Sequence, residues 1–288
     1  MGRFGELALR SNDLDEILTE ACRLAGEALG TELAKVMELQ PDGQTLCVRA
    51  GVGWKPGVVG NTTVRASEDT SEGHALRTGE PMISPDISLE TRFTYAPFLI
   101  DNGVRAVANV IIIGGRDKPP FGILQVDSRM PRQFTANDTA FLRGYANLLA
   151  ATVDRLRIYG EVRDADARLR LALETGELGS WELGLVTGNA TRTPRYDQIF
   201  GYTDPPAAWS YETFLSHVVD EYRDEVATAL HHAVDAGVDW HFQCRIRRAD
   251  TGGVRWIEAR GRPDAGQGNR PAHLLGIVAD ITKRKQVE

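Results

Sequence analysis

Cysteine and histidine are the residue types in this chain that could bind a metal or a haem group. The three cysteines are Cys22, Cys47 and Cys244, and no two of them stand in the C-x-x-C spacing of a zinc site or redox motif. Such wide spacing favours reduced, structural thiols. His231 and His232 are adjacent in a predicted helix, where neighbouring side chains point about 100° apart. We expect both on the solvated face of that helix, and we expect no metal site.

Catalytic motifs are the next possible source of chemistry. The chain has no P-loop, no H-E-x-x-H motif, no Gly-Gly-Asp-Glu-Phe motif and no set of residues that combines a nucleophile, a base and an orienting acid. The segment "GGRDKPP" (114–120) is typical of a hairpin turn between two apolar runs. The sequence therefore predicts that this chain is not itself an enzyme.

Composition and charge limit the class of protein. The 288 residues are 42% hydrophobic and 25% charged, which suits two domains of about 100–150 residues, each with its own core. The formal net charge is −7, whereas a nucleic-acid-binding surface needs a concentrated basic face. No apolar stretch of about 18 residues and no signal-peptide pattern are present. We expect a cytoplasmic protein that binds neither nucleic acid nor membrane.

A long helical pattern over residues 135–174 divides the chain. Its apolar residues recur at intervals of three, four or seven positions. A helix of this length exceeds what a globular domain normally needs, so we expect its apolar stripe to pair with a second copy of the chain in a homodimer. Gly160 is where we expect a break or a kink. The residues predicted to form the dimer helix are Leu142, Tyr145, Leu149, Val153 and Leu156.

The residues before this helix predict an α+β unit. A helix is expected to begin after the cap signals at 11–13 and to end near Gly30. The segments "LAKVMEL" and "TLCVRAGVG" flank a Pro-Asp-Gly turn, which predicts a hairpin.

A second strand pair is predicted from "GVRAVANVIII" and "FGILQVDS", whose near-continuous apolar runs are typical of strands covered on both faces. The connection between the two pairs contains a short predicted helix, "SEGHALRTG", and an irregular stretch. Long structured connections over a sheet are where small-molecule pockets are commonly built.

The residues after the long helix predict a second α+β unit. Residues 240–247 alternate between apolar and polar types, which indicates a half-buried antiparallel strand, and "VRWIEARGRP" returns after an Asp-Thr-Gly-Gly turn. A longer helix is predicted to end at Gly237, with Val226, Leu230 and Val234 on its buried side. The fold class expected for the whole chain is therefore α+β, with two domains, each a central antiparallel sheet flanked by helices, joined by a long helix.

Three separated segments of the N-terminal half resemble a GAF domain in their order and spacing. They are "SEGHALRTGEPMISPDISLETRF", "GVRAVANVIII" and "PFGILQVDSRMPRQFTANDTAFLRGYANLLAATVDR". The resemblance implies a GAF-like sensor domain over residues 1–158. GAF domains bind different ligands, among them cyclic nucleotides, bilins and haem, so the resemblance implies a small-molecule pocket without naming its ligand.

The residues that mark particular ligands in this family are mostly missing. Members that bind cyclic nucleotides carry an Asn-Lys…Phe…Asp-Glu signature, of which this chain has only Phe134 and Asp138. Bilin-binding members carry Asp-Ile-Pro and a suitably placed cysteine, whereas this chain has Asp-Ile-Ser at 86–88 and no such cysteine. We therefore expect no chromophore, metal or other cofactor. An unknown small molecule in the pocket bounded by residues 71–104 remains the candidate ligand.

Four segments of the C-terminal half resemble a PAS domain with its PAC segment: "GSWELGLVTG", "IFGY", "GGVRWIEARGRP" and "LLGIVADITKRKQVE". The resemblance implies a PAS domain over residues 166–288, overlapped by the connecting helix at 135–174. Photoactive flavin members need a cysteine after the short helices, and "GYTDPPAAW" has none. Across both domains, the candidate ligand-binding residues are His74, Asp86, Phe93, Tyr95, Trp181, Phe200 and Trp240.

The end of the chain, "DIT" followed by a charged helix, resembles the exit of a PAS domain towards an effector. We expect Asp280 to cap amides at Thr282 or Lys283, or to pair with Arg260. Asp280, Thr282 and Arg260 are the predicted signal-relay residues, and an output domain is expected beyond residue 288.

The two resemblances together imply the sensory region of a bacterial signal-transduction protein, most like a sensor histidine kinase of a two-component phosphorelay. Such a module senses a small molecule or a partner and passes a conformational change through helices to its effector. Two alternatives stay open: a stand-alone protein–protein interaction module, and the sensor region of a diguanylate cyclase.

Overall fold

A computed structural model describes residues 2–115, 118–204, 206–264 and 272–287. Residues 116 and 117 of the predicted hairpin turn and residues 265–271 lie outside the described residues. The chain divides into two compact units, Met1–Val162 and Arg163–Glu288. Each unit is an antiparallel sheet flanked by helices, so the predicted α+β class is confirmed.

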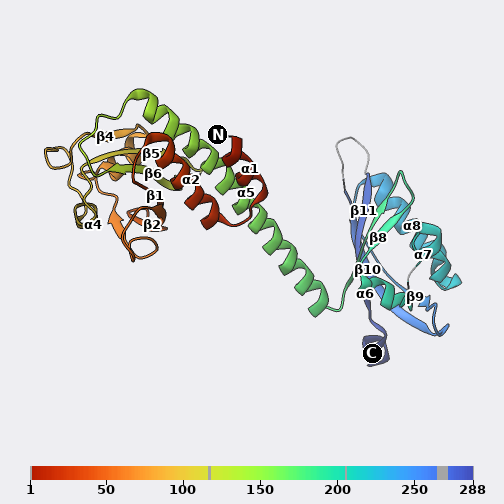
Figure 1. Ribbon diagram of the computed structural model, residues 1–288. Helices are drawn as coiled ribbons and strands as arrows, with labels where there is room; N and C mark the ends of the chain where they lie inside the picture. Colours follow the sequence, from red (N-terminus) through yellow and green to blue (C-terminus); the bar gives the residue numbers. More distant parts are fainter. Residues whose placement is uncertain (1, 116–117, 205, 265–271, 288) are drawn as a thin grey trace. The chain divides into compact units, whose positions relative to one another are not determined.

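The first unit contains a six-stranded sheet in the order β3-β2-β1-β6-β5-β4 (Figure 1). Its strands are β1 (Leu33–Leu39), β2 (Thr45–Val52), β3 (Thr63–Arg65), β4 (Met82–Ser84), β5 (Ala106–Ile112) and β6 (Gly122–Ser128). Its helices are α1 (Gly2–Arg10), α2 (Leu14–Leu29), α3 (Ser71–Thr78), α4 (Pro97–Asp101) and the first part of α5 (Ala136–Thr175). Both predicted strand pairs form, whereas α1, α4, β3 and β4 were not predicted.

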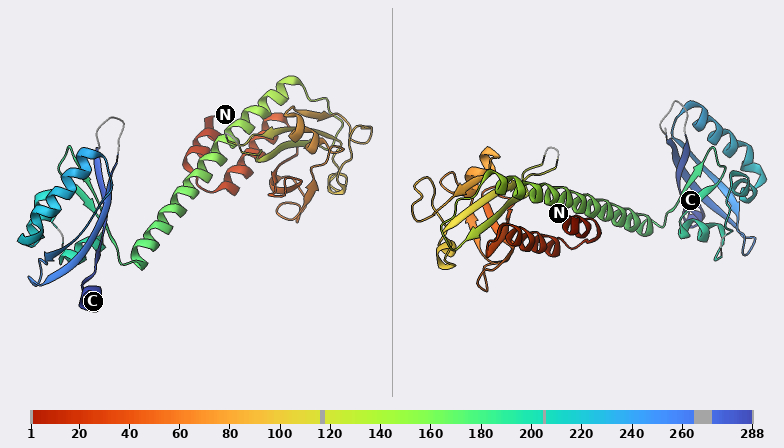
Figure 2. Two further views of the ribbon diagram at one scale, coloured as in Figure 1. Left: turned by 180° about the vertical axis from the view of Figure 1, so that it is seen from behind. Right: turned by 45° about the horizontal axis from the view of Figure 1, so that its top comes forward.

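Helices α2 and α5 cover one face of this sheet, as both views in Figure 2 show. Helix α2 begins where predicted, because the Asp13 carboxylate accepts hydrogen bonds from the amides of Asp15 and Glu16 at 2.9 and 3.2 Å. It ends at Gly30, whose φ of 60° is in the left-handed region that glycine adopts without strain. The opposite face of the sheet is covered by α3, α4 and the connections around them.

The second unit contains a five-stranded sheet in the order β8-β7-β11-β10-β9. Its strands are β7 (Gly179–Gly184), β8 (Ala190–Arg192), β9 (Trp240–Arg247), β10 (Val254–Asp264) and β11 (His273–Asp280). Its helices after α5 are α6 (Pro194–Phe200), α7 (Tyr211–His217), α8 (Asp220–Ala236) and α9 (Thr282–Val287). The predicted alternation of β9 is confirmed, since its apolar side chains are buried against α6, α7 and α8.

Helix α5 is continuous over 40 residues, so the predicted break at Gly160 is wrong. A Cβ at Gly160 would meet nothing within 4 Å, and one glycine costs a helix only about 1 kcal/mol. The helix begins with a reciprocal cap, in which the Asp138 amide donates to the Thr135 hydroxyl and the Thr135 amide donates to the Asp138 carboxylate. The helical turns on either side therefore stabilise α5 by more than this one glycine destabilises it.

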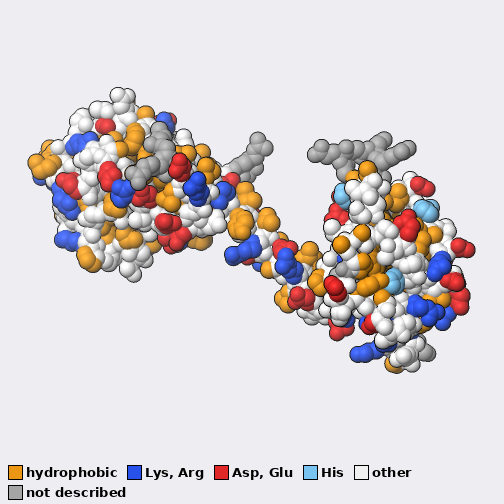
Figure 3. Space-filling model, turned by 45° about the vertical axis from the view of Figure 1, so that its right-hand side comes forward, with side chains coloured by type: hydrophobic (Ala, Val, Ile, Leu, Met, Phe, Trp, Pro, Cys, Tyr) orange, Lys and Arg blue, Asp and Glu red, His pale blue; other side chains and the backbone are white. Residues whose placement is uncertain are grey.

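Three of the residues predicted for a dimer interface on α5 belong to the core of the first unit. Leu142, Tyr145 and Leu149 are 0%, 3% and 0% exposed and pack in the cluster formed with α1 and α2. They are unavailable to a second chain, which corrects that prediction for these three side chains. Val153 and Leu156 are half-buried. The exposed apolar residues of α5 lie further along, where Figure 3 shows hydrophobic and charged side chains interspersed.

Candidate functional site

Three polar residues form one row across the middle of the first sheet. Lys35 of β1 lies opposite Gln125 of β6, and Gln125 lies opposite Asn109 of β5. Residues directly opposite each other on antiparallel strands have Cβ atoms about 5 Å apart and point to the same face. All three residues are 0% exposed. We call Lys35, Gln125 and Asn109 the polar row.

The polar row lies on the face opposite α2 and α5, between two apolar clusters. One cluster contains Met37 and Ile123, and the other contains Leu33 and Val107. Polar groups in such surroundings lose their contacts with water, so each must find a partner in the protein or in a bound molecule.

Lys35 and Asp127 form a fully buried ion pair, with the Lys35 Nζ 2.8 Å from Asp127 Oδ2. The Gln125 Nε2 donates to Asp127 Oδ1 at 2.6 Å. The Lys35 ammonium also lies 4.5 Å from the ring centroid of Trp54 and 5.6 Å from that of Phe98, within the range of cation–π attraction. Burial raises the pKa of Asp127, and the Lys35 ammonium opposes that rise.

The other end of the row contacts the first turn of α3. The Asn109 Nδ2 donates to Ser71 Oγ at 3.3 Å, and Ser71 Oγ donates to Glu72 Oε2 at 2.9 Å. Glu72 is only 2% exposed, and burial raises the pKa of its carboxyl. Two buried carboxyl groups, on Asp127 and Glu72, therefore flank a row that contains one ammonium.

Two carbonyl oxygens of the row have no hydrogen-bond donor among the described residues. They are Asn109 Oδ1 and Gln125 Oε1, both buried. A buried acceptor left without a donor costs about 1–3 kcal/mol. The row is thus the part of this domain that most needs hydrogen-bond donors from outside the protein chain.

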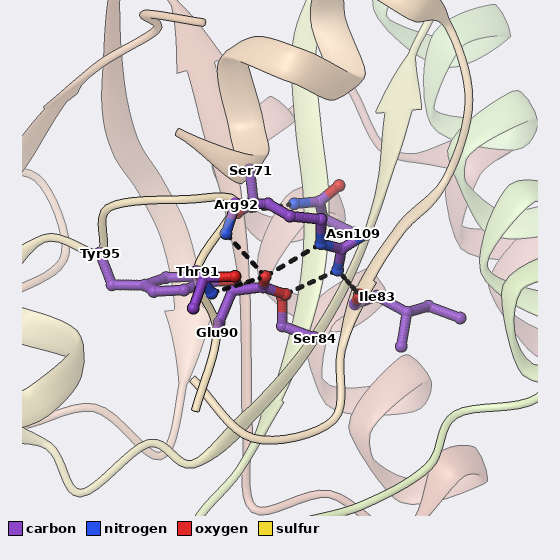
Figure 4. Close-up of polar contacts among 8 residues, drawn as sticks. All are labelled: Ser71, Ile83, Ser84, Glu90, Thr91, Arg92, Tyr95 and Asn109. Carbon is purple, nitrogen blue, oxygen red and sulfur yellow. Dashed lines mark hydrogen bonds and ion pairs between the residues drawn. The ribbon is translucent and has the colours of Figure 1, made fainter. Parts of the chain in front are cut away.

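A second network holds the segment 90–95 against β4 (Figure 4). The Ser84 hydroxyl donates to Glu90 Oε2 at 2.9 Å and is hydrogen-bonded to the Tyr95 hydroxyl. Arg92 pairs with Glu90 at 2.6 Å and donates to the Ile83 carbonyl at 3.0 Å. The Arg92 guanidinium lowers the pKa of Glu90 to about 2, and burial raises the pKa of Tyr95 to about 12. The Arg92–Glu90 pair and the Ser84 hydroxyl therefore fix the position of Tyr95.

The structure brings together some of the residues predicted to bind a ligand in this domain. The His74 and Phe93 rings lie 5.5 Å apart at the half-buried side of α3. Tyr95 belongs to the Ser84 network. Asp86 forms the predicted turn, accepting from the Ser88 amide at 3.0 Å, and pairs with Arg105, whose guanidinium lowers the pKa of Asp86 to about 2.

The predicted aromatic residues of the second domain lie in its core. Trp240, Gly261, Gly276 and Trp181 are successive partners across β9, β10, β11 and β7, and the two indole rings stack at 5.6 Å. We call these four residues the aromatic row. A Cβ at Gly276 would lie 2.7 Å from Trp181 Cζ2, so the glycines make room for the rings. Phe200 is 0% exposed in the same core.

The cavity left beside this aromatic row is about 30 Å³, the share of liquid volume that one water molecule occupies. It is lined by Trp181, Leu183, Ala190, Tyr196, Trp209, Ser210, Tyr211, Phe214, Leu230 and Leu274. A second, more open cavity of about 1050 Å³ is lined by all four residues of the aromatic row, together with side chains such as Leu173 and Arg260.

Of the two predicted contacts of Asp280, the structure contains one and not the other. Asp280 Oδ1 accepts from the Thr282 amide at 2.8 Å, so Asp280 caps α9 as predicted. Arg260 pairs instead with Glu258 at 3.0 Å, so the alternative Asp280–Arg260 pair is wrong. The Thr282 hydroxyl also accepts from the Trp256 amide at 3.0 Å, which ties α9 to β10.

The polar row was not predicted from the sequence. Each of its members is a polar residue with apolar residues on both sides in its strand: Lys35 in "LAKVMEL", Asn109 in "AVANVII" and Gln125 in "GILQVDS". That pattern is the signal that could have found them, because an isolated polar residue in a strand covered on both faces must be buried.

No group of His, Cys, Asp and Glu side chains able to hold a metal ion occurs among the residues that the structure describes. In the same part of the chain, no helix is long and apolar enough to cross a membrane.

Comparison with family models divides the chain in the same order as its two sheets. Residues 13–153 match the model described as "GAF domain", and residues 189–278 match the model described as "PAS fold". Among solved structures, the GAF domain from a phosphoenolpyruvate-protein phosphotransferase of Coxiella burnetii is similar with a TM-score of 0.50 and 19% identity. It covers 56% of this chain and 94% of that one. This likeness concerns the fold alone.

The curated relatives are named "Blue-light-activated histidine kinase". The protein from Brucella anthropi is 32% identical over 128 residues, which is 44% of this chain and 25% of that protein. The protein from Brucella ovis is 30% identical over 143 residues, which is 50% of this chain and 28% of that protein. The chain thus spans about a quarter of the length of these relatives.

Proposed function

Because this chain carries a GAF domain followed by a PAS domain, we propose that it is the sensory part of a cytoplasmic signalling protein whose effector is a histidine kinase. The observation that carries the proposal is this domain order together with curated relatives that are named histidine kinases. In this role the chain binds a signal and transmits a conformational change through α5 and α9, and the kinase reaction belongs to the effector.

The GAF domain is the signal-binding part of this proposal. Its central row is polar and buried and includes two carbonyl oxygens with no donor in the described part of the chain. A small molecule that supplied donors would satisfy them. Neither a chromophore nor a metal is part of the proposal, because the donors that the row needs are ordinary N–H or O–H groups.

The sensory role is tested by joining this chain, in frame after residue 288, to the catalytic part of a Brucella anthropi blue-light-activated histidine kinase. Autophosphorylation of the fusion is expected to change when the polar row is altered by Asn109→Leu, and when α9 loses its cap through Asp280→Ala. The exposed substitution Thr228→Ala serves as the control. Unchanged autophosphorylation in both variants, with both domains folded, would contradict the proposal.

A homodimer along the second half of α5 is the second part of the proposal. Exposed apolar residues follow one another at alternating intervals of four and three, which is the coiled-coil spacing. They are Ile158, Val162, Ala165, Leu169 and Ala172. Ile158, Val162 and Leu169 are 49%, 64% and 59% exposed, and a second copy of the stripe would cover them.

The dimer is tested by light scattering on Val162→Glu with Leu169→Glu, which places a charge at two positions of the stripe. We expect this pair to leave monomers with both domains folded. Ala167→Glu with Leu171→Glu is the matched control, because those residues lie on the opposite side of α5 and Leu171 is 65% exposed. A wild-type chain that stays monomeric at every concentration would overturn the dimer proposal.

A further inference from the structure

We propose that the polar row of the GAF domain receives the amino group of a small-molecule ligand, as a primary ammonium. This inference rests on the proposed sensory function and names the chemical class of its signal. It is carried by the arrangement of Asn109, Gln125, Glu72 and Asp127.

The two free acceptors are side by side and fixed in orientation. Asn109 and Gln125 are direct cross-strand partners, so their side chains extend from neighbouring positions on one face. The Gln125 amino group donates to a carboxylate, which can only accept, and this sets the direction of its carbonyl. The Asn109 amino group donates to Ser71 Oγ, whose own proton is directed to Glu72. Neither side-chain amide can exchange the positions of its oxygen and nitrogen without losing its hydrogen bond.

The charge around the row favours a cation. Within the described part of the GAF domain, the buried charged side chains are Lys35, Asp127 and Glu72. Lys35 is paired with Asp127 at 2.8 Å, whereas the Glu72 carboxyl accepts a hydrogen bond from the Ser71 hydroxyl and forms no ion pair within the described part of the chain. A second positive charge in the row would favour the ionised form of Glu72, which burial alone opposes. An anionic ligand group would instead meet two carbonyl oxygens and two carboxyl groups.

A primary ammonium matches both requirements, since it has three N–H donors and one positive charge. Two donors would satisfy Asn109 Oδ1 and Gln125 Oε1, and hydrogen bonds from a charged donor are stronger than those from a neutral one. A water molecule could also supply two donors, but it carries no positive charge to interact with the two buried carboxyl groups. The row therefore distinguishes amines from alcohols of the same shape.

The test uses the whole chain and three primary amines: ethylamine, putrescine and glycine. Each is compared with a counterpart that lacks an amino group, which is ethanol, 1,4-butanediol or acetate. Calorimetric titration is expected to show saturable binding of at least one amine and none of its counterpart. Asn109→Leu and Gln125→Leu are each expected to weaken that binding at least about tenfold, because an acceptor is lost.

The controls separate a lost ligand contact from a lost fold. Ile111→Leu changes the same face of the sheet one row away and is expected to bind the amine as the wild type does. Asn109→Asp keeps the size of the side chain and adds a negative charge, so it is expected to retain or strengthen amine binding even if the leucine variants unfold.

Three results would overturn the inference. They are binding of no amine, equal binding of the amine-free counterparts, and a crystal structure grown with the amine in which only a water bridges Asn109 and Gln125. A neutral or anionic ligand whose binding needs the polar row would reject the amine and leave the sensory role intact. An amine that binds the chain but never alters the kinase fusion would reject the sensory role and leave the inference intact.

Discussion

The two sheets of this chain fill their central rows in opposite ways. In the GAF domain, Lys35, Gln125 and Asn109 form a row with polar side chains and two carbonyl oxygens that lack donors in the described part of the chain. In the PAS domain, Trp240 and Trp181 flank two glycines and stack over them. The aromatic row is held by ring packing and leaves one buried donor, Trp240 Nε1, without a partner in the described part of the chain, whereas the polar row leaves two carbonyl acceptors.

The two rows also differ in how they contribute to the stability of their domains. A row of stacked rings stabilises the PAS core through burial and dispersion. A polar row contributes little to stability unless every member is satisfied. Four changes can test how the two rows differ in their contribution to stability.

The largest effect is expected from breaking the buried ion pair of the polar row. Lys35→Met leaves the Asp127 carboxylate buried without its cation, which should lower the free energy of unfolding by about 3–5 kcal/mol. Urea unfolding followed by circular dichroism measures it. The double variant Lys35→Met with Asp127→Leu should recover most of the loss. Arg23→Met, which removes an exposed pair with Glu20 and Glu27, should cost no more than about 1 kcal/mol.

The next effect concerns the glycines of the aromatic row. A Cβ at Gly261 would lie 2.0 Å from the Leu275 carbonyl oxygen and 2.4 Å from Trp240 Cζ2. Gly261→Ala should therefore destabilise the PAS domain by about 1–3 kcal/mol, since neither the backbone nor the packed ring can move freely. Gly160→Ala is the matched control: it meets open space within a helix and should add about 0.5–1 kcal/mol of stability. An equal loss in both variants would show that packing over the glycines is not the cause.

A smaller effect is expected where β11, which contributes Gly276 to the aromatic row, passes into α9. Asp280→Ala removes the acceptor of the Thr282 amide and should cost about 1 kcal/mol. Asp280→Asn keeps an acceptor at that position and should restore most of the loss. If the asparagine variant is as unstable as the alanine variant, the charge of Asp280 matters and its capping bond does not.

The smallest effect is a difference in how pH acts on the two domains. Burial raises the pKa of Glu72, so the GAF domain should gain stability from this group as pH falls from neutral towards its unfolded value of about 4.5. Donors from Gln243, His241 and Arg260 lower the pKa of Glu258 to about 2, so its contribution to the PAS domain is present above about 4.5 and is lost between there and 2.

Urea unfolding of Glu72→Gln and Glu258→Gln across that range of pH provides the check. The first variant should lack the gain on acidification, and the second should lack the loss. Identical pH profiles for the two variants would mean that the environments of these carboxyl groups do not differ as described.

Sequence patterns predicted the strand pairs and most of the longer helices, because each depends on local periodicity. The β9 alternation and the Asp13 cap are examples, and both occur as expected. The break predicted at Gly160 failed because propensity at one residue is a small term beside the turns on either side. Helix α1 was missed because no cap signal or turn marks its start, although Phe4 packs 5.1 Å from Tyr145.

The sequence predicted residues around the polar row but none of the polar row itself. His74, Asp86, Phe93 and Tyr95 were selected because polar and aromatic residues in long connections commonly line pockets. The polar row depends on the register of three strands that are far apart in sequence, with Lys35 and Gln125 separated by 90 positions. No local pattern reports that register. A polar residue between apolar neighbours in each strand was the available signal, and it becomes specific only when the strands are aligned.

The position of Trp54 has an optical consequence. It is the only tryptophan before Trp181 in the sequence, its indole lies 4.5 Å from the Lys35 ammonium, and its Nε1 donates to the Ala34 carbonyl at 2.8 Å. Indole emission responds to nearby charge, so a second cation entering beside Lys35 would shift the emission of this one fluorophore. Binding of the proposed amine would thus be measurable as a shift in the ultraviolet emission of Trp54.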